Sequence, residues 1–267
     1  MVKTRKKAVV AMSGGVDSSV AAAILKKNGF DVLGVTMSFN LTDKTAVRNA
    51  RRVADFLGIR HRVVDFTACL EEKVIADFIQ SYLTGKTPNP CVLCNLFIKF
   101  GVLLKQALAW GYDFLATGHY AQKLETKEGL LLKKGRDKTK DQSYFLYRLT
   151  QRQLRSILFP LGDFTKQEVI KFSRKLHLPV VQGRESQEIC FLSGTDYRRF
   201  LKKRLAAGIK PGLVVDKAGN VLGRHQGIPF YTIGQREGLN IALGWRAYVV
   251  RVNALENRIV LGKLKDA

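Results

Sequence analysis

The sequence is short of acidic residues, and it has no internal repeat and no low-complexity segment. Its charged side chains comprise 45 Lys and Arg but only 22 Asp and Glu, which gives a net charge of +23. So large a positive charge repels itself in the folded state, and an anionic partner is the natural explanation, with nucleic acid favoured over a membrane surface. A merely solubilising excess of charge is the alternative, but it seldom reaches this size.

Long hydrophobic runs are also missing. No apolar run approaches the ~18 residues that cross a bilayer, and the basic start MVKTRKK leads into an apolar stretch too short for a secretory signal. We therefore expect a cytoplasmic protein with no membrane partner. Four reduced cysteines in that compartment favour metal binding or catalysis over a disulfide framework. They are Cys69, Cys91, Cys94 and Cys190.

Strand and helix patterns alternate in the first part of the chain, where buried-strand runs are separated by amphipathic helices of 10–15 residues. This alternation predicts a doubly wound parallel sheet of the α/β class, with ligands bound beyond the carboxyl ends of the strands. The expected strands are 7–12, 32–37, 61–66 and 114–117, and the expected helices are 18–27, 46–57, 70–83 and 97–110.

The pattern changes near residue 186. Gly and turn residues become frequent, and short alternating runs appear at 248–252 and 258–261, after one helix at 196–206. We predict two domains. Residues 1–185 would form the α/β domain, and residues 186–267 would form a loop with one cysteine followed by a small, mainly β domain.

A glycine loop, Ser13-Gly14-Gly15-Val16-Asp17-Ser18, lies between the first expected strand and helix. The glycines let the backbone approach a ligand closely, and the helix start favours an anion, although a plain turn has a similar composition. The phosphate loop of common NTPases is absent, because Gly85-Lys86-Thr87 has Gln80 where the first glycine should be. A dinucleotide-binding fingerprint is missing too.

Further motifs follow in a fixed order. Cys91-x-x-Cys94 follows a proline-bounded turn that begins at Thr87 and precedes a helix. The glycine loop resembles the pyrophosphate loop of the PP-loop ATP pyrophosphatases, and together the motifs resemble the bacterial tRNA-specific 2-thiouridylase family from about residue 9 to residue 261. The other motifs are Ala116–Tyr120, Lys140–Leu146, Ser186–Phe191, Gly223–Gly227 and Thr232–Leu239.

The resemblance implies ATP-dependent thiolation of the tRNA wobble uridine to 2-thiouridine through an adenylated intermediate. Asp17 would suit a role linked to Mg²⁺, because hard cations take carboxylate oxygens. The implied ATP contacts are Ala11, Met12, Ser13, Gly14, Gly15, Val16, Asp17, Ser18, Met37 and Gly118.

For the nucleic acid, the resemblance implies tRNA as a partner, with a sulfur donor that is either sulfide or a persulfide-carrying protein. Cys94 takes the position of the nucleophile and Cys190 that of the sulfur-carrying thiol, and a helix starting after Asn95 would lower the pKa of Cys94. His119 is either a base or phosphate contact or a structural histidine. Implied contacts to the target base are Asn89, Pro90 and Cys91, and those to tRNA are His119, Lys140, Asp141 and Gln142.

Two departures from the family pattern affect the chemistry. Cys91 stands where the family usually has Asp, and the sequence stops near residue 267, where the family continues into a C-terminal β-barrel that helps to hold tRNA; this predicts a short form. Cys91, Cys94 and Cys190 could together hold a 4Fe–4S cluster with one open iron, which is the favoured interpretation. A persulfide pair with Cys91 as bystander and a zinc site lacking one ligand remain open.

Four further residues are expected to have structural roles. Cys69 matches no motif and is expected to be a small buried residue, and Phe145, Tyr147 and Phe159 are expected in the core.

The helix at 196–206 would carry a basic stripe that has two interpretations: it contacts RNA phosphates, or it is simply a solvated face. The stripe consists of Arg198, Arg199, Lys202, Lys203 and Arg204.

Two other functions of the protein remain open. One is sulfur transfer to another RNA site or to a metabolite, and the other is non-catalytic RNA binding or sulfur trafficking.

Overall fold

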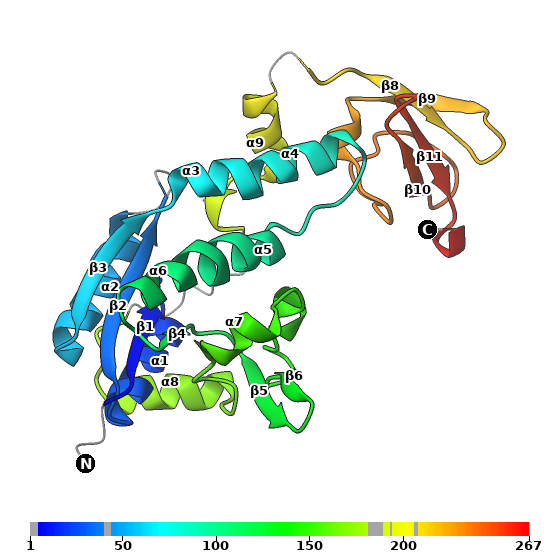
Figure 1. The fold of residues 1–267 in the computed structure, drawn as a ribbon. Coiled ribbons are helices and arrows are strands. Elements are labelled where there is room, and N and C mark those ends of the chain that lie inside the picture. Colours follow the sequence, from blue (N-terminus) through cyan, green and yellow to red (C-terminus); the bar gives the residue numbers. More distant parts are fainter. Residues whose placement is uncertain (1–4, 40–43, 181–188, 193, 206–207, 267) are drawn as a thin grey trace. The chain divides into compact units, whose positions relative to one another are not determined.

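A computed structural model describes residues 5–39, 44–180, 189–192, 194–205 and 208–266. The chain forms two compact units (Figure 1). Unit 1 comprises Met1–Lys73 and Cys91–Ser193, and unit 2 comprises Val74–Pro90 and Gly194–Ala267. The boundary predicted at residues 185 and 186 lies outside the described residues, and unit 2 also contains the segment 74–90, which we had expected in the first domain.

Unit 1 is built on a five-stranded parallel sheet with strand order β3-β2-β1-β4-β7. The order changes direction between β1 and β4, and doubly wound sheets bind ligands at such a switch point. The predicted α/β class is thus confirmed; β7, of two residues, was not predicted. The strands are β1 (Lys7–Ala11), β2 (Asp31–Ser38), β3 (Arg60–Asp65), β4 (Phe114–Ala116) and β7 (Ile157–Leu158).

Three helices cover one face of this sheet: α1 (Val16–Lys27), α2 (Lys44–Leu57) and α8 (Lys166–Lys175). Helix α1 lies between the other two and contacts both. Its small buried residues Ala21 and Ala22 let it pack closely on β1. Helix α8 starts with a capping box, in which Thr165 and Glu168 satisfy each other's backbone amides. The first turn of α8 is therefore held firmly.

A continuous helical segment, Pro90–Ala109, contributes to the other side of unit 1 through α6, which contacts β4. It consists of α5 (Pro90–Leu93), the π-helix η2 (Cys94–Leu103) and α6 (Leu104–Ala109). The two cysteines therefore lie inside a helix and not on a turn before one. Proline is favoured at the first helical position, because its missing N–H would have no partner there.

This helix also corrects the expectation that no segment is apolar enough to cross a membrane. By length and composition it passes that test, with 20 residues and a mean hydropathy of 1.6. However, 44% of the apolar window is buried inside the protein, and the core helix of a globular domain gives the same result. Helix α3 (Thr67–Leu70) packs against η2.

The remaining part of unit 1 follows β4. A hairpin of β5 (Ala121–Thr126) and β6 (Gly129–Lys134) leads to the 3₁₀ helix η3 (Ser143–Leu146) and to α7 (Gln151–Arg155), and η4 (Cys190–Leu192) comes last. Tyr147 is 66% exposed, so its predicted place in the core is wrong. Phe145 and Phe159 are partly buried.

Unit 2 has a four-stranded sheet with order β10-β11-β8-β9. The helical segment from η1 (Glu71–Ile75) into α4 (Ala76–Leu83) enters this unit because aromatic rings hold it there: Tyr82 stacks on Tyr197 of α9 (Tyr197–Arg204) with 4.8 Å between ring centroids. The small β-rich second domain is confirmed. The other elements are β8 (Gly212–Val215), β9 (Val221–His225), η5 (Ile228–Phe230), β10 (Tyr248–Asn253), β11 (Arg258–Gly262) and η6 (Leu264–Asp266).

Candidate active site

The glycine loop lies directly after β1, at the switch point of the sheet. Gly14 has φ = +78°, a conformation that L side chains rarely adopt, and a Cβ added there would lie 2.5 Å from the Ala46 carbonyl oxygen. Position 14 therefore requires glycine for two reasons: the backbone conformation and the close approach of α2.

Serine side chains fix the shape of this loop. The Ser13 amide donates to Ser18 Oγ over 3.1 Å, and Ser18 Oγ donates to the Gly15 carbonyl oxygen, also over 3.1 Å. Gly15 occupies the N-cap position of α1 and offers no side-chain cap. The first amides of a helix without such a cap are well suited to an anion.

Two more of the predicted ATP contacts lie at the same edge of the sheet. Gly118 follows β4, and a Cβ there would be 2.9 Å from the Ser18 amide nitrogen, so the absent side chain lets this segment pack on the start of α1. Met37 is partly buried near the carboxyl end of β2, next to β1. The structure thus brings the predicted nucleotide-binding residues together around one sheet edge.

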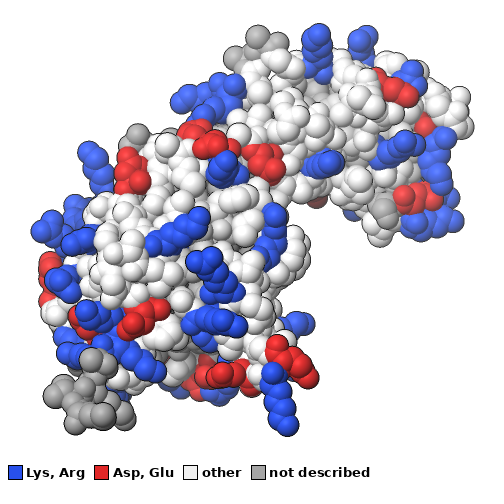
Figure 2. All heavy atoms as spheres, viewed as in Figure 1, with Lys and Arg blue, Asp and Glu red and all other residues white. Residues whose placement is uncertain are grey.

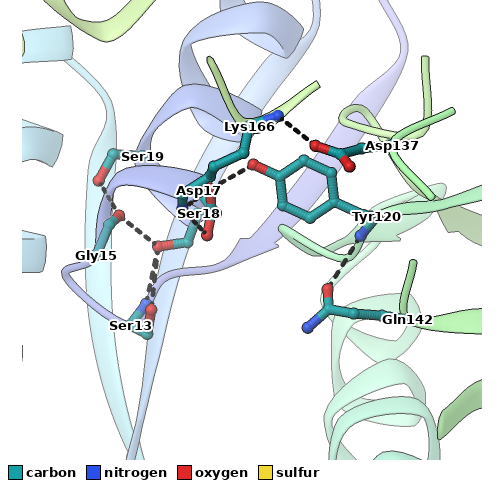
Figure 3. Close-up of polar contacts among 9 residues, drawn as sticks. All are labelled: Ser13, Gly15, Asp17, Ser18, Ser19, Tyr120, Asp137, Gln142 and Lys166. Carbon is teal, nitrogen blue, oxygen red and sulfur yellow. Dashed lines mark hydrogen bonds and ion pairs between the residues drawn. The ribbon is translucent and has the colours of Figure 1, made fainter. Parts of the chain in front are cut away.

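A partly buried ion pair lies beside this loop (Figure 3). Lys166 Nζ lies 2.7 Å from both carboxylate oxygens of Asp17, and the Tyr120 hydroxyl donates to Asp17 Oδ1 over 2.7 Å. The Lys166 side chain is 13% exposed and that of Asp17 is 34% exposed. Asp17 is therefore held by two donors, from the segment after β4 and from the start of α8.

The predicted tRNA contacts after β6 make internal hydrogen bonds. Gln142 Oε1 accepts from the Tyr120 amide over 3.0 Å, and Asp141 accepts from the Gly135 amide and the Ser143 hydroxyl, each over 2.8 Å. Lys140 is partly buried. Asp141 and Gln142 thus position the segment that carries Tyr120, and any contact with RNA would be additional to this role.

His119 is buried. Its Nδ1 lies 2.7 Å from Thr117 Oγ1, and its ring lies near those of Phe100 and Phe159, with centroids 6.0 and 6.4 Å away. Burial, and to a smaller extent the charge of Lys99, hold the pKa of His119 well below its usual value. The imidazole is therefore neutral at physiological pH, which favours a positioning role over contact with a phosphate.

The buried imidazole makes stability depend on pH. In the unfolded chain His119 takes up a proton near pH 6.5, but in the folded protein it resists the proton, so stability is complete above that pH and falls below it. The loss in the free energy of unfolding approaches about 1.4 kcal/mol per pH unit for this one group.

Urea unfolding tests this contribution. Between pH 7.5 and 5.5 the free energy of unfolding should fall less for His119→Asn than for the wild type. The exposed control His177→Asn should keep the wild-type difference, and equal pH effects in all three proteins would contradict the assignment.

Three cysteines lie close enough in unit 1 to interact electrostatically. Cys94 interacts with Cys91 and Cys190, and Cys190 interacts with Cys91. Cys91 and Cys190 are exposed, whereas Cys94 is buried. The Ser186, Gln187 and Glu188 part of the predicted Cys190 motif lies outside the described residues. Cys69 is half-buried rather than buried, and it also interacts with Cys94.

The pKa of Cys94 was predicted to be low, and this is wrong. Burial raises it to about 11, and the neighbouring thiols add to the effect, while the Lys99 cation opposes it. The helix starts at Pro90, so Cys94 is in its second turn and gains little from the helix amino terminus. Cys190 keeps solvent-accessible surface, but the protein atoms around it remove hydration and raise its pKa too.

This protonation state has a measurable consequence. At pH 8 the thiolate fraction of Cys94 should be about a hundredfold below that of an ordinary thiol, because its pKa is raised from 9.0 to about 11. Iodoacetamide should therefore label Cys91 much faster than Cys94, as followed by peptide mass spectrometry. Lys99→Met should slow Cys94 labelling further, whereas Lys105→Met, on the exposed side of the same helix, should not. Equal labelling of Cys91 and Cys94 would refute the assignment.

As a metal site, the thiols do not fit in this arrangement. Among the described residues, no group of three or more His, Cys, Asp or Glu side chains has the geometry to hold a metal ion. Cys91, Cys94 and Cys190 interact over a distance but do not converge on one point. The arrangement therefore does not supply the ligand set of the cluster predicted on them.

The charge of Lys99 acts on both the thiols and His119. Lys99 is half-buried on η2 and interacts with Cys94, Cys190 and His119. Cys94 and Lys99 are five residues apart, and a π-helix hydrogen-bonds residues at that spacing, whereas an α-helix would turn them about 140° apart. His119 in turn lies between Gly118 and Tyr120, which contact α1.

The predicted basic stripe of α9 belongs to unit 2. Three of its cations lie over aromatic rings of their own unit: Arg198 over Tyr197, Lys202 over Phe230 and Arg204 over Phe200, 5.2–5.6 Å from the ring centroids. Figure 2 shows Lys and Arg over the visible faces of both units, with fewer Asp and Glu. The positive charge is therefore spread over folded surfaces and is not confined to one helix.

Three residues at this site were given no role from the sequence: Lys99, Tyr120 and Lys166. Tyr120 ends the recognised motif Ala116–Tyr120 and Lys99 follows the Cys91-x-x-Cys94 motif by five residues, so their positions could have been a signal. Lys166 is 149 residues from Asp17 along the chain, and only its place after Thr165, at a capping box, marks it as the start of a helix.

Sequence comparisons match both units. Residues 6–194 match the family described as "tRNA methyl transferase HUP domain", and residues 198–263 match "tRNA methyl transferase PRC-barrel domain". The tRNA-specific 2-thiouridylase MnmA of Carboxydothermus hydrogenoformans is 50% identical over 279 residues, which cover 98% of this chain and 76% of that protein. MnmA of Pelotomaculum thermopropionicum is 49% identical over 97% of this chain and 74% of that protein.

Solved structures give a more distant similarity. The U34-tRNA thiolase NcsA from Methanococcus maripaludis with its [4Fe-4S] cluster is 18% identical, with a TM-score of 0.46 over 76% of this chain and 68% of that one. NMN synthetase from Francisella tularensis is 16% identical, with a TM-score of 0.45 over 78% of this chain and 80% of that one.

Proposed function

Because the chain belongs to the tRNA-specific 2-thiouridylase family, we propose that it is a tRNA-uridine 2-sulfurtransferase that uses ATP to convert the wobble uridine of tRNA to 2-thiouridine. One observation carries the proposal: the glycine loop and the three cysteines of the two motifs belong to the same compact unit. The net charge of +23 suits a polyanionic substrate.

The first step activates the base. Uracil O2 is a poor leaving group, and its attack on the α-phosphorus of ATP releases pyrophosphate and leaves O2 esterified to AMP. The amides at the start of α1 and the shaped loop at Gly14 would hold the phosphates. The Asp17 carboxylate suits Mg²⁺, which when bound neutralises phosphate charge. The target uridine must leave its stack to reach such a site.

In the second step sulfur replaces the adenylated oxygen. Cys190 would carry an extra sulfur atom as a persulfide, received from a donor, and this terminal sulfur attacks C2 while the C2–O bond breaks and AMP leaves with the electron pair. The Cys94 thiolate then attacks Cys190 Sγ, which forms a Cys94–Cys190 disulfide and leaves the sulfur on C2. A thiol reductant supplies two electrons to restore both cysteines. The exposed Cys190 can meet a donor, and the buried Cys94 is protected from side reactions.

A 4Fe–4S cluster is the second candidate for sulfur delivery. Cys91 next to Cys94 and Cys190 favours it, because it adds a third soft ligand. Since these side chains do not form a ligand set as they stand, we derive no step through a cluster. Protein purified without oxygen should be analysed for iron and sulfide. About four of each per chain, lost in Cys91→Ala but kept in Cys69→Ala, would establish the cluster; their absence together with an active Cys91→Ala would leave the persulfide route.

The function is tested by reconstitution. The purified protein is mixed with ATP, Mg²⁺, a low-molecular-weight persulfide as sulfur donor, a thiol reductant and an unmodified tRNA carrying uridine at the wobble position. The amount of 2-thiouridine is measured by mass spectrometry alongside AMP and pyrophosphate, and a parallel reaction receives sulfide in place of the persulfide. We expect equal amounts of the three products, and none with a matched tRNA carrying cytidine there. Thiolation at another position of the tRNA, or of a small metabolite, would show that the proposed substrate is wrong. If no pyrophosphate were released with tRNA or with a metabolite, the protein would be a non-catalytic RNA-binding protein. We expect the reaction to take place in the cytoplasm.

A further inference from the structure

The ion pair between Lys166 and Asp17 has a consequence for nucleotide binding. The Lys166 side chain is only 13% exposed, so its charge needs a counter-ion, and it finds one in a residue that the glycine loop itself supplies. Its ammonium lies at 2.7 Å from both Asp17 oxygens, so it occupies the positions that a cation bound to this carboxylate would use. A metal ion and the ammonium cannot share both oxygens.

The backbone of Lys166 is fixed by hydrogen bonds, so that only its side chain can move to a different partner. Its backbone amide donates to Asp137 Oδ2 over 2.9 Å (Figure 3). The capping box of Thr165 and Glu168 fixes the first turn of α8. Helix α8 packs against α1, whose amino-terminal amides face the same edge of the sheet. The long flexible side chain therefore starts from a fixed point and can reach other anions near the start of α1.

We propose that Lys166 is a polyphosphate-sensing residue: it neutralises Asp17 when no nucleotide is bound, and it transfers its ammonium to the pyrophosphate end of ATP when the magnesium nucleotide takes over the Asp17 carboxylate. This inference rests on the proposed use of ATP. It assigns to Lys166 the discrimination between ATP, which has a pyrophosphate group, and AMP, which has none. Tyr120 remains on Asp17 Oδ1 and keeps the carboxylate oriented during the exchange.

Binding measurements separate this role from a structural one. Titration calorimetry with Mg²⁺ and α,β-methylene-ATP, which cannot release pyrophosphate, should show binding to Lys166→Met weakened about 10- to 100-fold, the range of one charge-assisted hydrogen bond. Binding of AMP should stay within about twofold of the wild type. Lys171→Met, an exposed lysine on the same helix, should bind both nucleotides like the wild type. Equal weakening of both nucleotides, or of neither, would overturn the proposal.

A second variant tests the exchange through an expected gain in affinity rather than a loss. Asp17→Asn keeps the shape of the side chain but frees Lys166 from its counter-ion, so inorganic pyrophosphate in EDTA should bind more tightly to Asp17→Asn than to the wild type. Adding Lys166→Met should abolish this gain. An unchanged or weaker affinity of Asp17→Asn for pyrophosphate would overturn the proposal, even if Lys166→Met failed to fold. If the wild type bound neither AMP nor α,β-methylene-ATP, the proposed function would fall as well, whereas wild-type binding with no effect of Lys166→Met would overturn this inference alone.

Discussion

Replacing Cys94 with serine is expected to reduce formation of 2-thiouridine at least about a thousandfold, and Cys190→Ser should do the same. An alkoxide at either position cannot carry sulfur or release it from a partner thiol. Both variants should still release pyrophosphate in the presence of tRNA, because activation of the base needs the glycine loop and not the thiols. Product tRNA and pyrophosphate are measured in the same reaction, with mass spectrometry for the nucleoside.

Cys69→Ser is the matched control. Cys69 interacts with Cys94 but is half-buried on α3 and matches no motif, so its loss should leave thiolation within about a factor of three. If Cys94→Ser kept substantial thiolation, the assignment of the nucleophile would be wrong. If it lost pyrophosphate release as well, the separation between activation and sulfur transfer would fail.

The second large effect is expected from Gly14→Ala. The added methyl group would lie 2.5 Å from the Ala46 carbonyl oxygen and 3.2 Å from the Ala50 amide nitrogen, both of them backbone atoms of α2, and the residue would also be strained at φ = +78°. We expect a loss of about 3 kcal/mol or more in the free energy of unfolding. Binding of ATP should be lost in the fraction that folds, because the loop must shift.

Gly111→Ala separates the two causes. Gly111 has φ = +79°, almost the same as Gly14, but nothing lies within 4 Å of a Cβ added there. Its substitution should therefore cost only the backbone strain, about 1 kcal/mol, and leave ATP binding intact. Urea unfolding of both variants gives the comparison. Equal losses of stability would show that the contact with α2 contributes nothing.

The sequence pattern predicted the centre of unit 1 well. Four strands and the helices α1 and α2 came from hydrophobic periodicity, because β1, β2 and β4 are largely buried apolar runs, whereas β3 is a more polar and exposed strand at the edge of the sheet. The glycine loop was also recognisable, since Gly14 meets a conformational demand that few other residues can meet. Those features depend on short stretches of chain.

One of the missed features is local, and the others depend on tertiary contacts. Pro90 begins a helix, where its fixed φ is an advantage, and Cys94 therefore lies in the second turn of that helix, where it is buried. The segment of α4 joined unit 2 because Tyr82 stacks on Tyr197, far along the chain. The pair of Lys166 and Asp17 likewise exists only because α8 packs beside α1.

The account depends on ATP making a uridine oxygen easy to expel, and isotope tracing tests this most directly. A tRNA carrying a single wobble uridine labelled with ¹⁸O at C2 is thiolated by the wild-type protein with unlabelled ATP, and AMP, pyrophosphate and water are examined by mass spectrometry. The account predicts that each 2-thiouridine formed leaves one ¹⁸O atom in AMP. Label in water or pyrophosphate, with unlabelled AMP, would contradict it.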